Sequence, residues 1–336
     1  MDSAVARLDG ILVHHSKFEE AIRRIEQCYT YAQQPSEPVC MALIGESRTG
    51  KSRALETYLL KHPPTRLSDG MHVPILLVKA PSRPTVKGLA EVMLDKLSAP
   101  DPEHGTENER TRRLKVLMQG TQTRMIMIDE FQHFYDKGTK LIIHHVTDWL
   151  KILVDDLKCA LVVAGLPSCR IVIDQNEQLA GRFLAPVHLS RFRWNDSGER
   201  EDFRAILREF HDDLRHKFRI PEFHSEGMAF RFWCATGGLI GYVTKLLRTA
   251  VCNAADEKRR EITLEHLNRA HEQSMWLEPG GQEIPKAFDR SFKLEMTSNV
   301  VQQALHIGTV VTPLESTPRR TGRERLKSAN ACLTKS

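Results

Sequence analysis

Short apolar runs alternate with helix-like segments through roughly the first 190 residues of the chain. Five of these runs are predicted β-strands, because each is short and bounded by turn residues: 39–44, 73–79, 124–128, 160–164 and 187–189. The segments between them carry apolar residues at helical spacing, and we expect helices at 51–61, 88–97, 109–119, 139–157 and 174–184. Such alternation indicates α/β class, with a five-stranded parallel sheet that has helices on both faces.

The pattern differs on either side of this α/β segment. Before it, apolar residues recur at helical spacing from Phe18, with Ser16 as the expected N-cap. After it no strand-like run occurs, and we expect helices from a capping sequence at 195–199 to about 217, and at 225–235, 239–256 and 264–273. The chain is therefore divided into an N-terminal helical segment, an α/β domain, a helical domain and a flexible basic tail: 1–34, 35–194, 195–277 and 278–336.

Composition excludes several classes of protein. No stretch reaches the roughly 20 apolar residues of a membrane helix, and the N-terminus lacks the basic start of a signal peptide, so we expect no membrane partner. The seven cysteines show no C-x-x-C pair, which favours buried thiols in a reducing cytoplasm over disulfides or a zinc site. The net charge of +5 is compatible with nucleic-acid binding but does not require it.

The clearest chemical signal follows the first predicted strand. Residues 45–52 read Gly-Glu-Ser-Arg-Thr-Gly-Lys-Ser, the phosphate-loop pattern G-x-x-x-x-G-K-S between a strand and a helix. Backbone N–H groups of such a loop cradle phosphate oxygens, and the helix after it adds its positive N-terminal end. We expect Lys51 to reach the β- and γ-phosphates of ATP and Ser52 to ligate Mg²⁺, with a plain glycine turn as the alternative. The expected nucleotide contacts are Gly45, Glu46, Ser47, Arg48, Thr49, Gly50, Lys51, Ser52 and Arg53.

The third predicted strand supplies the second half of a nucleotide site. It ends in Asp129-Glu130, and adjacent acids at a strand end are the Walker B arrangement. We expect Asp129 to hold the Mg²⁺ shell with Ser52, and Glu130 to orient and deprotonate the attacking water. An exposed acidic turn is the alternative. Gln132 and His133 are further candidates for positioning that water, with packing below the site as their alternative role.

These motifs resemble those of AAA+ ATPases. One predicted strand separates the phosphate-loop strand from the Asp-Glu strand, and the following strand ends in Gly-Leu-Pro ahead of a helical domain. The resemblance implies the AAA+ sheet order 5-1-4-3-2 and a helical lid. It narrows to the TniB/TnsC family over roughly residues 12–277, on four segments: Gly45–Ser52, Ile128–His133, Ala164–Pro167 and Leu179–Phe183.

Members of this family are bacterial regulators of transposons that carry a DDE transposase, including CRISPR-associated ones. The resemblance implies Mg²⁺-dependent ATP hydrolysis and self-assembly, as a ring or a helix, on double-stranded DNA without sequence preference. It also implies recruitment of the DDE transposase, linked to a TniQ-like target-selection protein. Arg182 takes the place of an arginine finger that would reach a neighbouring subunit's γ-phosphate. A surface arginine or an intrachain ion pair is the alternative.

The sensor positions of related ATPases match less well. Ser168 follows Gly-Leu-Pro and is a sensor-1 candidate. The sensor-2 arginine is missing: Gly241 takes its place, and Lys245 lies one turn later. This departure argues against strong coupling of lid position to the γ-phosphate.

For DNA the sequence offers basic patches and no recognition motif. In resembling proteins the sheet edge after the second strand faces a central DNA channel, and cations there would neutralise phosphates without sequence preference. The candidates are Lys79, Arg83, Lys87, Arg110, Arg112 and Arg113, with a solvated helix face or loop as the alternative for each. The basic tail is expected to contact DNA, to dock onto the transposase, or to be disordered padding.

Two other functions remain open from the sequence. A helicase loader or replication initiator would share the ATPase but would favour a winged-helix domain after the lid. A small-molecule kinase would use the phosphate loop for transfer to a metabolite and would need an acceptor pocket. Stimulation of ATP hydrolysis by duplex DNA rather than by a metabolite separates the kinase from the other two.

Overall fold

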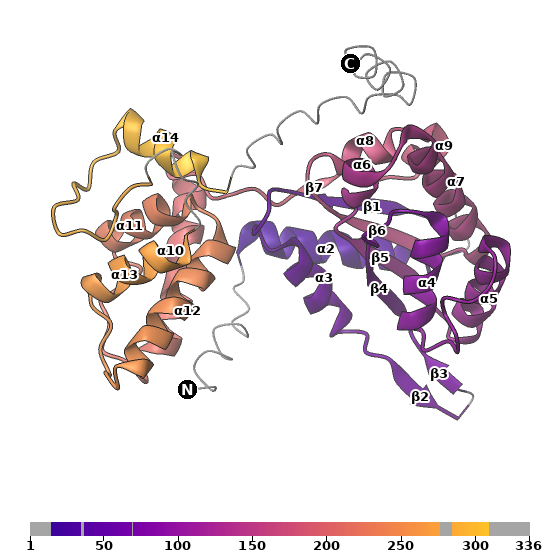
Figure 1. The fold of residues 1–336 in the computed structure, drawn as a ribbon, viewed down its shortest axis with the longest axis horizontal. Coiled ribbons are helices and arrows are strands. Elements are labelled where there is room, and N and C mark those ends of the chain that lie inside the picture. The colour runs from indigo at the N-terminus through magenta and orange to yellow at the C-terminus, as the bar shows by residue number, and fades with distance from the viewer. Residues whose placement is uncertain (1–14, 35–36, 69, 276–283, 309–336) are drawn as a thin grey trace, which may run out of the picture.

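The computed structural model describes residues 15–34, 37–68, 70–275 and 284–308, and a five-stranded parallel sheet forms the centre of its α/β part (Figure 1). The strands are β1 (Cys40–Ile44), β4 (Ile75–Lys79), β5 (Met125–Asp129), β6 (Ala160–Gly165) and β7 (Val187–His188). They run across the sheet in the order β4-β5-β6-β1-β7. The first strand therefore lies between the fourth and the fifth, which confirms the predicted fold class and the sheet order implied by the AAA+ resemblance.

Both faces of the sheet are buried by helices, and β5 shows why its sequence is apolar throughout. Successive side chains of a strand point to opposite faces, so Ile126 and Ile128 pack into one apolar core and Met125 and Met127 into another. Helices α2 and α3 cover one face, and α4 to α9 contribute to the core on the other. Their bounds are α2 (Ser16–Tyr31), α3 (Lys51–Leu59), α4 (Val86–Lys96), α5 (Glu107–Gly120), α6 (His133–Lys137), α7 (Lys140–Leu157), α8 (Cys169–Ile173) and α9 (Glu177–Ala180).

A separate apolar core holds the helices that follow the sheet, which lie to one side of it in Figure 1. These helices are α10 (Ser197–Leu214), α11 (Glu226–Thr236), α12 (Ile240–Asp256), α13 (Leu264–Ser274) and α14 (Ser298–His306). The prediction of a flexible tail from residue 278 is wrong for 284–308, because Ala287, Phe288 and Ala304 are buried in this core. The arginine-rich part of the tail, from residue 309, lies outside the described residues.

Three local predictions also differ from the structure. A hairpin of β2 (Thr65–Leu67) and β3 (Gly70–His72) precedes β4, where no strand was predicted. His15 rather than Ser16 caps α2, because His15 has an extended backbone and its side chain accepts a hydrogen bond from the Phe18 N–H. Of the helix expected at 174–184 only the short α9 forms, because α8 already ends at Ile173 and Asn176 adopts an extended conformation that caps a new start.

The described cysteines are free thiols, as expected from the sequence, and Cys28, Cys40, Cys159, Cys169 and Cys234 are buried. Burial disfavours the thiolate and raises the pKa of Cys159 to about 12. Among the helices that the structure describes, none combines the length and apolar character that crossing a membrane requires.

Candidate nucleotide site

The phosphate-binding loop joins the end of β1 to the start of α3, and two glycines fix its path. A Cβ on Gly45 would lie 2.0 Å from the Leu189 carbonyl oxygen, so only glycine lets the loop pass the chain that leaves β7. Gly50 has a φ of +98°, a left-handed conformation that favours glycine, and it directly precedes α3. The loop therefore ends at a helix N-terminus, where unpaired N–H groups attract an anion.

Lys51 is enclosed by its own loop. Its Nζ donates to the carbonyl oxygens of Gly45 at 2.9 Å and Glu46 at 2.5 Å, and the residue is only 9% exposed. Burial lowers the pKa of the Lys51 ammonium, while the carboxylates of Glu130 and Asp129 act in the opposite direction. A phosphate group in the loop would give this partly desolvated ammonium a better partner than two carbonyls.

Ser52 and Asp129 meet at the other side of the loop. The Ser52 hydroxyl donates to Asp129 Oδ2 at 2.6 Å, although the two residues come from α3 and β5. The second carboxylate oxygen of Asp129 accepts from the Glu130 backbone N–H at 2.9 Å. A hydroxyl and a carboxylate side by side, next to a phosphate site, are the oxygen ligands that Mg²⁺ uses together with nucleotide phosphates. These residues therefore fit the magnesium ion expected from the sequence.

The Glu130 carboxylate is held by a buried glutamine. Gln132 is 4% exposed, and its Nε2 donates to Glu130 while its Oε1 accepts from the Leu166 N–H at 3.1 Å. The amide thus bridges Glu130 to the chain that leaves β6. A Cβ on Gly165 would lie 2.2 Å from Gln132 Oε1, so the glycine makes room for the bridge. Gln132 orients Glu130, whereas His133 Nδ1 lies 3.5 Å from the Ala80 carbonyl oxygen, outside the pocket.

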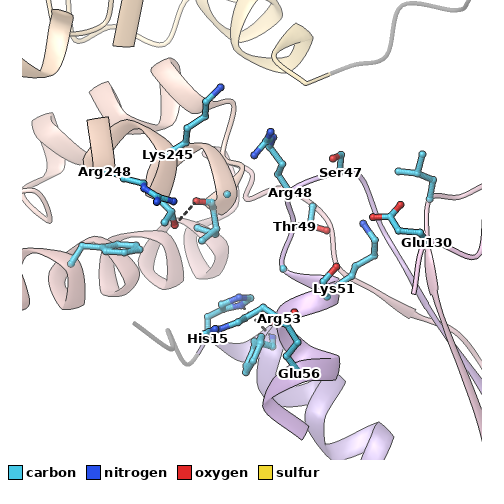
Figure 2. Close-up of a pocket in the computed structure, with 18 of the residues that line it drawn as sticks. His15, Ser47, Arg48, Thr49, Lys51, Arg53, Glu56, Glu130, Lys245 and Arg248 are labelled. Atoms are coloured by element: carbon cyan, nitrogen blue, oxygen red, sulfur yellow. Dashed lines mark hydrogen bonds between the residues drawn. The ribbon is translucent and has the colours of Figure 1, made fainter. Parts of the chain in front are cut away.

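A pocket of about 770 Å³ lies between the phosphate loop and the helical region (Figure 2). Figure 2 shows Lys245 and Arg248 on α12, on the opposite side of this pocket from Lys51 and Glu130. Gly45 and Glu46 do not line it, but seven of the expected nucleotide contacts do: Ser47, Arg48, Thr49, Gly50, Lys51, Ser52 and Arg53. Several further lining residues carry no sequence motif, and all but Glu56 come from segments distant from the loop: His15, Phe18, Glu56, Phe210, Thr244 and Arg248.

Gly241 brings α12 into direct contact with the phosphate loop. Its backbone N–H donates to the Arg48 carbonyl oxygen at 3.0 Å, and a Cβ there would lie 2.7 Å from Arg48 Cβ. The residue that the AAA+ resemblance puts in the sensor-2 place thus makes a backbone contact with the phosphate loop. Cations at this wall come instead from Lys245 and Arg248, one and two turns later.

Neither Arg182 nor Ser168 lines the nucleotide pocket of this chain. Arg182 binds Asp155 of α7 through Nε at 3.0 Å and Nη2 at 2.9 Å, so the intrachain ion pair left open by the sequence is present. Its carbonyl accepts from Cys40, at the end of β1 opposite the phosphate loop. Ser168 precedes α8 and does not line the pocket, and the chain leaving β6 reaches the site through Leu166.

The six candidate DNA contacts separate into two groups. Arg110 is corrected: it is 2% exposed and its Nη1 donates to Glu91 at 2.6 Å, so it stabilises the packing of α5 against α4. Arg113 donates to the carbonyl oxygens of Asp101 and His104 and fixes the loop before α5. The other four candidates are exposed: Lys79, Arg83, Lys87 and Arg112. Lys79 is the last residue of β4, so it lies at the same carboxyl end of the parallel sheet as the phosphate loop.

Comparisons with known proteins agree with this geometry. Among solved structures, Cdc6p from Pyrobaculum aerophilum matches with a TM-score of 0.60 and 13% identity, covering 83% of this chain and 72% of that one. The Aeropyrum pernix ORC1 protein in complex with DNA matches with a TM-score of 0.54 and 17% identity, covering 78% and 66%. The ADP form of the Aeropyrum pernix ORC2 protein gives 0.55 and 12%, covering 78% and 69%. At these identities the matches show the fold, that of P-loop AAA+ ATPases.

At the level of sequence, a comparison with curated proteins gave no match. The family model described as "Bacterial TniB protein" matches residues 9–194, which include the phosphate loop, the Asp-Glu strand end and the sheet. The match covers more than half of the chain. The chain therefore belongs to the TniB family of AAA+ ATPases.

Proposed function

We propose that this protein is an ATP-dependent regulator of DNA transposition. It assembles as a ring or helix on target duplex DNA and recruits a DDE transposase, which it links to a TniQ-like target-selection protein. The observation that carries the proposal is the joining of Lys51, Ser52, Asp129 and Glu130 at one end of an AAA+ sheet. Membership of the TniB family supports the transposition role.

Hydrolysis of ATP would use groups that the fold already holds in place. Lys51 exchanges its loop carbonyls for β- and γ-phosphate oxygens, and the loop N–H groups bind the remaining charge. Ser52 and Asp129 would hold Mg²⁺, which supplies neutralisation of phosphate charge when bound. Glu130 accepts the proton of the attacking water, and Gln132 fixes the direction in which that carboxylate points.

DNA binding would use the exposed cations at the edge of the sheet. Lys79, Arg83, Lys87 and Arg112 are exposed and can neutralise backbone phosphates without reading bases. The structural neighbour from Aeropyrum pernix was solved in complex with DNA, which supports an AAA+ fold of this shape as a DNA-binding scaffold. Non-sequence-specific duplex binding follows from this set of contacts.

Assembly would complete the site through Arg182. Because this residue lies at the end of β1 opposite the phosphate loop, it can act as an arginine finger only toward another copy of the chain. In that role the guanidinium would leave Asp155 and bind the γ-phosphate of the neighbouring subunit. The ion pair with Asp155 would hold Arg182 in place until a subunit docks.

A replication initiator or helicase loader is the second candidate, favoured by the Cdc6 and ORC folds of the structural neighbours. Both functions predict ATP hydrolysis stimulated by duplex DNA, whereas a small-molecule kinase predicts a metabolite-dependent signal. Binding of purified transposase to the ATP-loaded protein on DNA separates the two. Retention of transposase supports the proposal, and its absence together with loading of a replicative helicase would replace it.

A further inference from the structure

A buried arginine contacts the phosphate loop from outside the nucleotide pocket. Arg191 follows β7, and its side chain is 8% exposed. Its Nε donates to the two carboxylate oxygens of Glu46 at 2.9 and 3.2 Å, and its Nη2 donates to the same carboxylate. A desolvated guanidinium requires such complete pairing, and a two-pronged pair fixes the direction of both side chains. Since Glu46 belongs to the phosphate loop, Arg191 anchors that loop without lining the pocket.

The rest of the guanidinium binds carbonyls at two helix ends. Nη1 donates to Gly237 at 3.3 Å and to Leu305 at 3.0 Å, and Nη2 donates to Ile307 at 3.1 Å. Gly237 ends α11, and the other two lie at the end of α14. The last carbonyls of a helix lack intrahelical donors and carry the negative end of its dipole, so a cation is favoured there. One side chain therefore joins the phosphate loop to the end of α14.

A second contact between the same two elements runs through Tyr242. The Arg48 guanidinium of the phosphate loop lies 4.9 Å from the centre of the Tyr242 ring. Gly308, just after α14, lies against that ring: a Cβ there would be 3.1 Å from Tyr242 Cε2 and 2.8 Å from Leu239 Cδ1. The φ of Gly308 is +75°, which also favours glycine. The end of α14 thus contacts Arg191 and Tyr242, which in turn contact the loop residues Glu46 and Arg48.

We propose that Arg191 is a positioning residue through which nucleotide binding at the phosphate loop and docking of α14 stabilise each other. The inference rests on the proposed function, because it requires a nucleotide in the loop. Glu46 is the link: its backbone carbonyl accepts from Lys51 Nζ at 2.5 Å, and its carboxylate accepts from Arg191. When Lys51 turns from that carbonyl to a phosphate oxygen, the constraint on Glu46 changes, and Arg191 transmits the change to α14.

Coupling of this kind is reciprocal. If α14 holds Arg191 in the orientation that supports the nucleotide-bound loop, the nucleotide must hold α14 equally. The segment from residue 309 follows α14 directly in the sequence. Nucleotide occupancy would therefore control the point from which the basic tail starts.

The test uses the full chain and ADP as the probe. We expect saturating ADP to slow hydrogen exchange of the peptide covering α14 in the parent protein. Arg191→Lys keeps the charge and loses the two-pronged pair, so it should raise the Kd for ADP by roughly 5- to 150-fold and abolish the ADP-dependent slowing. Arg193→Lys is the matched control, because Arg193 is 60% exposed and pairs with Glu199 and Asp196 at the surface, and it should change neither readout.

A second variant leaves the phosphate loop and Arg191 intact. Gly308→Ala disturbs the seat of α14 against Leu239 and Tyr242, so it should weaken ADP binding although it lies outside the pocket. The inference is overturned if both variants bind ADP within twofold of the parent, or if ADP leaves α14 exchange in the parent unchanged. A parent protein that binds no ADP would instead overturn the proposed function itself.

Discussion

Gly241→Ala tests whether contact between α12 and the phosphate loop is needed for nucleotide binding. The new methyl group would lie 2.7 Å from Arg48 Cβ and 3.1 Å from its carbonyl oxygen. Neither atom is the far end of a flexible side chain, so the helix and the loop must separate. Overpacking of this kind costs about 1–3 kcal/mol, and the backbone hydrogen bond from Gly241 to Arg48 would lengthen with it.

This free energy destabilises the arrangement in which α12 and the phosphate loop, the two walls of the pocket, are in contact. At about 1.4 kcal/mol for each tenfold change, we expect the Kd for ATP to rise by roughly 5- to 150-fold. Calorimetric titration of the parent protein and of the variant with ATP measures this change in Kd. Gly120→Ala is the control, because Gly120 ends α5 with no atom within 4 Å of its added Cβ, and it should bind ATP like the parent. An unchanged Kd for Gly241→Ala would show that the contact has no part in binding.

Three further outcomes follow from the site and its surroundings. Gln132→Ala should lower kcat for ATP hydrolysis about tenfold while leaving the Kd for ATP unchanged, because Glu130 loses its orienting amide; equal turnover in a steady-state assay would refute that role. Replacing Arg83 and Lys87 together with alanine should reduce the slope of log affinity against log salt by about two for any duplex, and an unchanged slope would remove this loop from the DNA interface. Arg110→Ala should lower Tm by several degrees without changing that slope, because it removes a buried side chain that packs α5 against α4; a salt slope that fell while Tm held would return Arg110 to the DNA contacts.

Contiguous motifs were sufficient to predict the centre of the fold and the residues that meet beside the phosphate loop. The phosphate loop and the Asp129-Glu130 strand end are local patterns whose chemistry depends on neighbours in the sequence. All five strands of the sheet were also predicted, since each is a short apolar run that helices bury on both faces.

Residues that act through distant partners escaped prediction. Arg191 and Glu46 are 145 residues apart in the sequence, and no sequence motif contains both of them. The Gln132 bridge to Leu166 depends in the same way on the pairing of β5 with β6. No local pattern contains these contacts.

One error could have been avoided from periodicity alone. Arg110, Leu114 and Met118 recur at intervals of four and share one face of α5, so Arg110 belongs to the buried face. Charge alone had suggested a DNA contact. Helix α14 was harder to find, because it is short and follows a polar stretch, and its burial depends on packing against α11. The domain boundaries at 34 and 194 remain a proposal, whereas the helical core extends beyond 277 to include residues of 284–308.

The central claim is that Glu130 activates water for ATP hydrolysis in a site formed by Lys51, Ser52 and Asp129. The most direct measurement is ATP binding and turnover by Glu130→Gln in the presence of duplex DNA. We predict that the variant binds ATP with the parental Kd, hydrolyses it at least a hundredfold more slowly, and stays assembled on the DNA. Hydrolysis at the parental rate would contradict the assignment of Glu130 and, with it, the mechanism proposed for the site.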